Sequence, residues 1–126
     1  MTVVLDAGAF VAIERGDRDL MAIIKRERLA GRVPLTHGGI VGQVWRSGMG
    51  RQANLARLLP GVEVVPIDRE LGRRSGVLLA AAATSDVIDA ALVLLARDGD
   101  ELFTSDPGDL TTLATAAGLH VDLIPV

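Results

Sequence analysis

The chain has no cysteine and no tyrosine, and aromatic residues make up only 2% of its 126 residues. Without cysteine it has no disulfide, no thiolate ligand for zinc and no cysteine nucleophile. No apolar run reaches the ~20 residues that a membrane-spanning helix needs. The amino terminus lacks the basic segment and apolar stretch of a signal peptide. We therefore expect a soluble, cytoplasmic protein.

What the chain does contain is aliphatic residues and a small excess of negative charge. Hydrophobic residues make up 49% of the sequence, which is enough for one core, and the length predicts a single domain over residues 1–126. The net charge of −3 argues against a general nucleic-acid binder, which is usually basic. It does not exclude an enzyme that acts on RNA, because a bound cation would offset clustered carboxylates.

Short aliphatic segments alternate with amphipathic ones along the whole chain. We expect strands at 2–6, 33–36, 62–67, 101–105 and 121–126, none with the alternating polar residues of a half-exposed strand. We expect helices at 8–15, 19–30, 39–47, 51–59, 68–83, 86–97 and 107–117, with glycine and proline at the joins. This order predicts an α/β fold, a three-layer α/β/α sandwich with a central parallel sheet of about five strands.

Aspartates stand at the ends of two strands and at the start of the helix that precedes the second of them. Asp6 ends the first strand and Asp106 the fourth, while Asp86 and Asp89 lie one helical turn apart. In parallel sheets, ligands bind beyond the carboxyl ends of the strands, where the strand order reverses. If the first and fourth strands are neighbours, the carboxylates meet there. Because unpaired charges are seldom buried, this arrangement indicates a site for a shared cation.

Each aspartate also has a simpler interpretation at a helix start. Asp6 and Asp106 suit the N-cap position. Asp86 and Asp109 fall where the helix dipole favours a carboxylate, so Asp86 is the more ambiguous member of its pair.

Other kinds of site have less support in the sequence. His37 and His120 lie far apart, and neither has a second His or Cys nearby. A dehalogenase-type phosphatase would have an aspartate where Gly8 stands. A receiver domain would have a lysine after a late strand, and the only lysine is Lys25 on an early helix. A metal-dependent reaction on phosphates remains the leading hypothesis.

Four segments together resemble the PIN-domain nucleases and, among them, the VapC toxins of bacterial toxin–antitoxin pairs. They are the strand ending in Asp6, the helix ending in Val44-Trp45-Arg46, Asp89-Ala90 at the start of an apolar helix, and the segment 102–106. The resemblance covers the whole chain. It implies endonucleolytic cleavage of RNA with Mg²⁺ or Mn²⁺, homodimers, and inhibition by a small VapB-like antitoxin whose carboxyl-terminal segment fills the active-site groove. The apolar helices at 39–45 and 51–59 also favour a homodimer.

The resemblance implies roles for individual residues. Asp6, Asp89 and Asp106 match three acidic residues of the family and would hold the metal with Asp86 beside them. Arg46 is the arginine we expect to contact an RNA phosphate.

Two positions depart from the family. Gln43 stands where the family has a glutamate, and its amide oxygen can take a metal or a water but brings no charge. Gly8 stands where the family often has Ser or Thr, which removes a hydrogen bond expected to orient Asp6. We therefore expect a metal-dependent endoribonuclease of weak activity. The alternative is a PIN-fold protein that has lost catalysis and acts by binding RNA or a partner.

Overall fold

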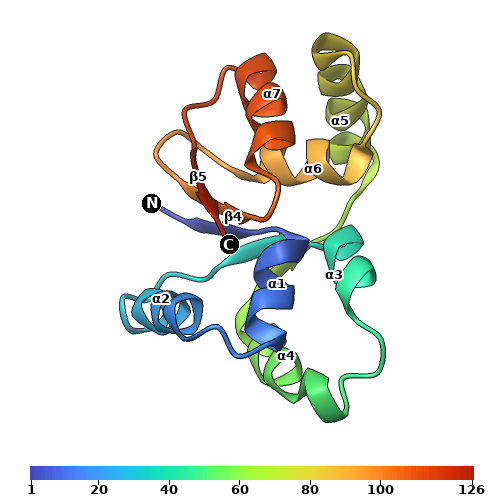
Figure 1. Ribbon diagram of the computed structural model, residues 1–126. Coiled ribbons are helices and arrows are strands. Elements are labelled where there is room, and N and C mark those ends of the chain that lie inside the picture. Colours follow the sequence, from blue (N-terminus) through green and yellow to red (C-terminus); the bar gives the residue numbers. More distant parts are fainter.

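Five short strands and seven α-helices make up the chain, and the computed structural model describes residues 1–126 (Figure 1). The strands are β1 (Val3–Leu5), β2 (Leu35–His37), β3 (Glu63–Val65), β4 (Glu101–Thr104) and β5 (Asp122–Pro125). The helices are α1 (Ala7–Glu14), α2 (Arg18–Leu29), α3 (Gly38–Val44), α4 (Ala53–Leu58), α5 (Arg69–Ala82), α6 (Val87–Leu95) and α7 (Pro107–Ala117), with 3₁₀ turns at Gly50–Gln52 and Leu59–Gly61. Every strand and helix expected from the sequence is present.

All five strands are parallel, in the order β3-β2-β1-β4-β5. Strand β1 is central, with Val4 opposite Leu35 of β2 on one side and Leu102 of β4 on the other. After β1, the chain places β2 and β3 on one side of this strand and then β4 and β5 on the other side. The strand order therefore reverses between β1 and β4, the pairing on which the cation-site hypothesis depends.

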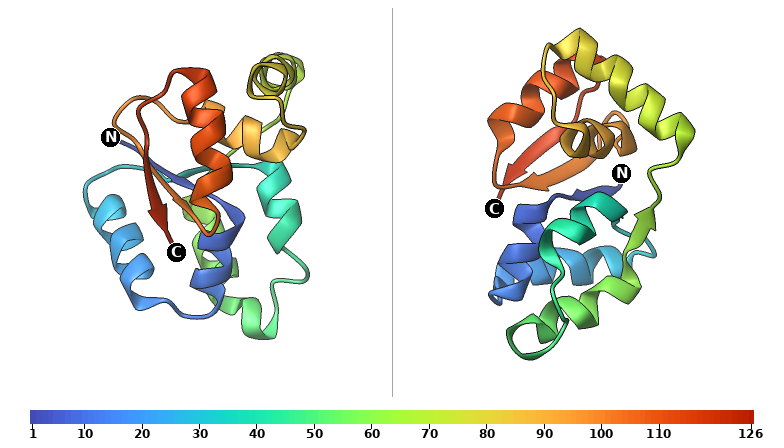
Figure 2. Two further views of the ribbon diagram at one scale, coloured as in Figure 1. Left: turned by 45° about the horizontal axis from the view of Figure 1, so that its top comes forward. Right: turned by 90° about the vertical axis from the view of Figure 1, so that its right-hand side faces the viewer.

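The helices cover both faces of the sheet. Helices α1 to α4 lie on one face and α5, α6 and α7 on the other, which Figure 1 and the right-hand view of Figure 2 show from two directions. This is the three-layer α/β/α arrangement predicted from the sequence. No single helix is long and apolar enough to span a membrane; α5 and α6 reach that length and composition only together, and they meet at 108°.

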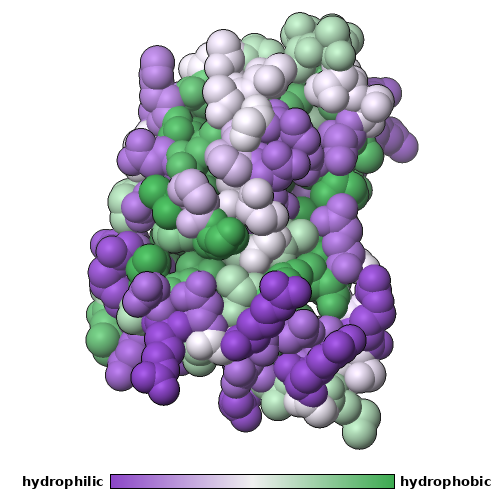
Figure 3. Space-filling model, in the orientation of Figure 1, coloured by the Kyte–Doolittle hydropathy of each residue, from purple (hydrophilic) through white to green (hydrophobic).

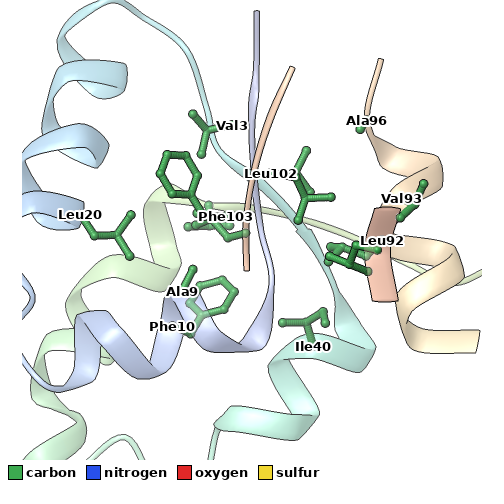
Figure 4. Packing of buried hydrophobic residues seen from close by; sticks show 14 of the residues in the cluster. Val3, Ala9, Phe10, Leu20, Ile40, Leu92, Val93, Ala96, Leu102 and Phe103 are labelled. Carbon is green, nitrogen blue, oxygen red and sulfur yellow. The ribbon is translucent and has the colours of Figure 1, made fainter. Parts of the chain in front are cut away.

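The core is aliphatic and follows the central strands. Both phenylalanines belong to it, Phe10 from α1 and Phe103 from β4, and both lie on the side of the sheet that carries α1 (Figure 4). Leu92 of α6 packs on the other side beside Leu102, and each of these leucines is fully buried. Burying one such side chain stabilises the fold by roughly 1.5–3 kcal/mol.

Helix α3 ends earlier than the sequence predicts, because the buried side chain of a glutamine forms hydrogen bonds with the backbone that follows the helix. The Oε1 atom of Gln52 accepts hydrogen bonds from the N–H groups of residues 46, 47 and 48, at 3.0 to 3.1 Å. Its Nε2 donates to the carbonyl of Val44 at 2.9 Å. Backbone groups held in this way cannot continue a helix, so α3 ends at Val44. The indole of Trp45 lies over Gly48, where a Cβ atom would come within 2.3 Å of the ring.

The apolar residues of α3 and α4 face the core of the same chain. Ile40, Leu55 and Leu58 are all buried. The expectation of a homodimer was based partly on these helices, of which Val41 and Val44 are only half-buried in the single chain. Large apolar residues stay exposed elsewhere, among them Val77 on α5 and Val87 on α6.

Candidate active site

Asp6 lies between the end of β1 and the start of α1 with both carboxylate oxygens hydrogen-bonded. Oδ1 accepts from the N–H of Ala7 at 2.7 Å, which makes Asp6 the N-cap of α1. Oδ2 accepts from the hydroxyl of Thr104 at 2.7 Å. The residue is 8% exposed, so its orientation is fixed by the protein. A carboxylate has about four acceptor positions, so these two bonds leave capacity for a ligand.

Thr104 connects this aspartate to the next strand, a role that sequence reasoning missed. It is fully buried at the end of β4. Its Oγ1 donates to Asp6 and accepts from the N–H of Asp106 at 2.9 Å. One hydroxyl therefore fixes the end of β1 relative to the start of α7. A threonine at a strand end is a weak signal until the pairing of that strand is known.

Asp86 and Asp89 stand at the start of α6, as the sequence predicts. Asp86 is exposed and is the N-cap, its carboxylate accepting from the N–H of Asp89 at 3.1 Å. Asp89 is partly buried. Burial, and after it the negative charges of Asp86, Asp6, Asp109 and Asp106, together raise the pKa of Asp89 to about 6. The carboxylates from three elements are therefore close enough to repel one another.

Asp106 and Asp109 add two carboxyl groups at the start of α7. The side chain of Asp106 is exposed and does not cap the helix. The pKa of Asp109 is raised by a hydrogen bond to the carboxyl of Asp106 and then by its charge, which places the two groups side by side. Sequence reasoning assigned Asp109 to the helix dipole alone. The structure makes it a fifth acidic residue of the cluster, on the turn after Asp106.

The departure at Gly8 has a steric explanation. A Cβ atom on residue 8 would lie 2.5 Å from Oγ, 2.7 Å from Cβ and 2.8 Å from the backbone nitrogen of Ser105. The side chain and backbone of Ser105 therefore fill the space that a serine or threonine side chain would need. The hydrogen bond to Asp6 expected from such a residue comes from Thr104 instead.

Gln43 and Arg46 lie at the carboxyl end of α3, and both are exposed. No hydrogen bond joins Gln43 to the aspartates. The guanidinium of Arg46 folds back onto its own helix, with Nη1 donating to the carbonyls of Trp45 at 2.7 Å and Gly42 at 3.3 Å. A cation at this end of a helix is favoured by the helix dipole.

The acidic cluster has no cationic partner within the protein. The only ion pairs join Glu27 to Arg26 and Arg32, and Glu101 to Arg26. No three His, Asp or Glu side chains come close enough to form a complete set of protein ligands for one ion. The residues can still hold a hydrated divalent cation, because Mg²⁺ keeps several waters and uses one or two carboxylates.

His37, like Thr104, lies near the aspartates although the sequence did not indicate it. It ends β2, is fully buried and N-caps α3. The pKa of His37 is lowered by burial, against smaller opposing effects of its bond to the carbonyl of Ile88 and of the Asp6 charge. The effect of Asp6 shows that this ring lies near the cluster. Its isolation from other His residues in the sequence gave no hint of this position.

In sequence, the chain matches no protein-family profile and no curated protein. In structure, it is similar to a chain in the crystal structure of VapBC2 from Rickettsia felis bound to a DNA fragment from their promoter. The TM-score is 0.71, the alignment covers 98% of each chain, and 12% of the residues are identical. At this identity the likeness establishes the fold. The chain has a PIN-like fold, the three-layer α/β/α sandwich that the sequence predicts.

Proposed function

We propose that this protein is a metal-dependent endoribonuclease of the VapC type. The observation that carries the proposal is the cluster of aspartates from three elements at the β1–β4 switch point. These carboxylates have no cationic partner in the protein, and their mutual repulsion contributes to the raised pKa of Asp89. A divalent cation would relieve that repulsion. The VapC-like fold supports the same assignment.

In this proposal Asp6, Asp89 and Asp106 would hold hydrated Mg²⁺ or Mn²⁺, one or two of them directly and the rest through bound water, with Asp86 at the rim of the site. When bound, the ion supplies Lewis acidity, which lowers the pKa of a water and offsets negative charge on the phosphodiester. Thr104 and the N–H of Ala7 keep Asp6 oriented. Asp89 is ionised, and so able to act as a ligand, above about pH 6.

Two exposed residues, Gln43 in the last turn of α3 and Arg46 just after the helix, would act on the RNA side of the site. Gln43 orients a water or a phosphate through its amide. Arg46 contacts a phosphate, for which its guanidinium must leave the carbonyls of Gly42 and Trp45. Those bonds are exposed and are easily exchanged for bonds to a phosphate, which binds guanidinium more strongly.

A direct test combines metal binding with cleavage. Millimolar Mg²⁺ or Mn²⁺ should raise the melting temperature, since a ligand at hundredfold excess over Kd stabilises the folded state by about 2.7 kcal/mol. The same ions should support cleavage of a structured RNA, and a chelator or Asp6→Asn should stop it. An unchanged melt together with intact RNA would reject the nuclease.

A groove at the far end of α1 from Asp6 supports an antitoxin-like partner. It has a volume of about 500 Å³ and lies between α1, α2 and α4. Its lining combines six apolar residues with three cationic ones and one amide: Ile13, Met21, Ala22, Ile24, Leu29 and Leu58, with Lys25, Arg28 and Arg57, and Asn54. In the orientation of Figure 3, long hydrophilic side chains project over this lower layer with apolar surface between them. Such a surface suits an amphipathic helix that carries acidic residues.

Co-purification tests this partner. We expect the product of a short reading frame next to this gene to co-purify with the protein. Met21→Asp, which places a charge in the groove, should abolish co-purification. Val77→Asp on α5 is the matched control, since Val77 is 72% exposed and lies outside the groove. We also propose a homodimer, which light scattering at micromolar concentration tests; a monomer mass would reject it.

The second candidate function is binding without catalysis. It is favoured by Gln43, which is neutral where the family has a carboxylate, and by the lack of three converging protein ligands. In that case RNA or the partner binds, but no divalent ion makes the protein cleave. Binding of a non-cleaved RNA by the parent and by Asp6→Asn with equal affinity would support this candidate over the first.

A further inference from the structure

The imidazole of His37 makes two hydrogen bonds with different elements. Nδ1 accepts from the N–H of Gly39 at 3.0 Å, so this nitrogen carries no proton. The ring proton is therefore on Nε2, which donates to the carbonyl of Ile88 at 2.8 Å. The side chain is completely buried. One ring thus joins the end of β2, the start of α3 and the first turn of α6.

The contact brings together helices from opposite faces of the sheet. Helix α3 lies with α1 on one face and α6 on the other, so they meet only past the end of β2 (Figure 1). Their approach is close. A Cβ atom on Gly39 would lie 2.5 Å from Cδ1 of Ile88 and 2.9 Å from Cε1 of His37. The absence of a side chain at residue 39 is what allows the ring and the isoleucine to pack there.

An N-cap alone does not require a histidine. Ser, Thr, Asn or Asp provides the acceptor for the helix N–H group and is the usual choice. The imidazole offers in addition a donor on its far side, and that donor is used on Ile88, the residue before Asp89. The position of Asp89 relative to β1 is thereby tied to the sheet through β2.

We propose that His37 is a positioning residue for the acidic site: its bond to the Ile88 carbonyl holds the first turn of α6 so that Asp89 faces Asp6. The effect of His37 on metal binding rests on the proposed function. The positioning itself is a property of the metal-free protein and is measured separately.

Two substitutions separate the two bonds of the ring. In His37→Asn the side-chain oxygen takes the place of Nδ1 and keeps the cap on Gly39, but no donor reaches Ile88. In His37→Gln the amide nitrogen takes the place of Nε2 and keeps the bond to Ile88, but the cap is lost. His37→Ser repeats the first case with a smaller side chain, in case the asparagine variant fails to fold.

Mn²⁺ binding, followed by electron paramagnetic resonance, is the first measurement. Loss of a group that orients a ligand weakens metal binding roughly tenfold to a hundredfold. We expect that loss for His37→Asn and His37→Ser, and an affinity within about threefold of the parent for His37→Gln, whose bond to Ile88 is retained. Asp100→Asn is the control. Asp100 is buried at the opposite end of β4, where it accepts from the N–H groups of Thr2 and Arg97. It should lower stability and leave Mn²⁺ affinity unchanged.

The second measurement is made without metal. An NOE between the δ-methyl of Ile88 and the α-protons of Gly39 reports the approach of α6 to α3. We expect it in the parent and in His37→Gln, and we expect it to be lost in His37→Asn and His37→Ser. The nitrogen shifts of the parent ring should show the proton on Nε2.

The two measurements separate failure of the proposed function from failure of the positioning role of His37. If the parent binds no Mn²⁺ but the NOE depends on the His37 donor, the proposed function fails and the positioning role stands. If the parent binds Mn²⁺ and His37→Asn binds it equally well, or keeps the NOE, His37 is only the cap of α3 and the inference is overturned. Weakened Mn²⁺ binding in Asp100→Asn as well would overturn it too, because general destabilisation would then account for the loss.

Discussion

The hydroxyl of Thr104 donates a hydrogen bond to the carboxylate of Asp6 over 2.7 Å, although 98 residues separate them in the chain. It joins β1 to β4 at the carboxyl ends of these strands, where the aspartates lie. The same hydroxyl accepts from the N–H of Asp106. The orientation of the first aspartate and the start of α7 therefore depend on one buried oxygen atom.

Replacing Thr104 with valine should test this dependence. Thr104→Val removes the donor and leaves Asp6 partly unsatisfied, so we expect a loss of about 1–3 kcal/mol in the free energy of unfolding. Mn²⁺ affinity should fall roughly tenfold or more, because Asp6 is no longer oriented. Urea denaturation and calorimetric titration measure the two effects. Ser75→Ala, which removes a buried hydroxyl bonded to the Leu71 carbonyl on α5, should affect stability alone. Unchanged metal affinity in Thr104→Val would show that Asp6 needs no such support.

A serine at position 8 should harm the protein instead of restoring a family feature. Its side chain would overlap both the side chain and the backbone nitrogen of Ser105. Overpacking of this kind costs about 1–3 kcal/mol, so Gly8→Ser should lower the unfolding free energy by that amount. Adding Ser105→Gly should recover part of the loss, but not all of it, because the backbone contact remains. Equal stability of Gly8→Ser and the parent would contradict the steric argument.

The raised pKa of Asp89 makes stability depend on pH in a definite direction. Its folded-state pKa is about 6, above the ordinary value of 3.8, so the folded protein binds this proton more tightly than the unfolded chain does. The stability that the protonated form contributes is full below the ordinary pKa and is lost as the pH rises through about 6. Asp89→Asn mimics the protonated form.

We therefore expect Asp89→Asn to raise the melting temperature of the metal-free protein more at pH about 8 than at pH about 5. The melts are recorded in chelator, with Asp98→Asn as the control, since Asp98 is bound to the N–H of His120 away from the cluster. The same variant should lose the stabilisation by Mn²⁺ that the parent gains. A variant that is less stable than the parent at pH about 8 would refute the repulsion among these carboxylates.

A glutamate at position 43 should strengthen the site if Gln43 limits the enzyme. Ligands that carry a charge bind a cation more strongly than neutral ones, so Gln43→Glu should tighten Mn²⁺ binding and raise cleavage of a structured RNA. Gln43→Met keeps the length without the amide and serves as the neutral control. If Gln43→Glu binds metal no better and the parent already cleaves RNA briskly, Asp6 and Asp89 suffice for one ion. If neither protein cleaves any RNA tested, the binding-only alternative gains.

The elements of the fold and the aspartates of the candidate site could be picked out from the sequence because both depend on local patterns. An aliphatic run that ends in a carboxylate identifies Asp6 and Asp106 without any knowledge of their neighbours. The supporting residues were not predictable in this way. Their roles come from contacts with segments that are distant in the sequence, as for Thr104, Ser105 and His37. The local pattern of apolar and polar residues gives no information on such contacts. The role of Gln52 was not predictable either, although its partners are close in the sequence. A glutamine among helix-forming residues predicts a helix, and nothing in the sequence indicates that its side chain is buried.

The pairing of β1 with β4 also determines when the site can come into being. Residues 1–6 leave the ribosome well before residues 101–104, yet β1 gains one of its two neighbouring strands only when residues 101–104 have been made. Contacts of such long sequence separation form late, because the intervening chain must first be ordered. A nascent chain that ends before Thr104 lacks both the hydroxyl that bonds to Asp6 and the carboxylate of Asp106. If the protein is a ribonuclease, its synthesis must therefore pass residue 106 before the chain has a complete active site.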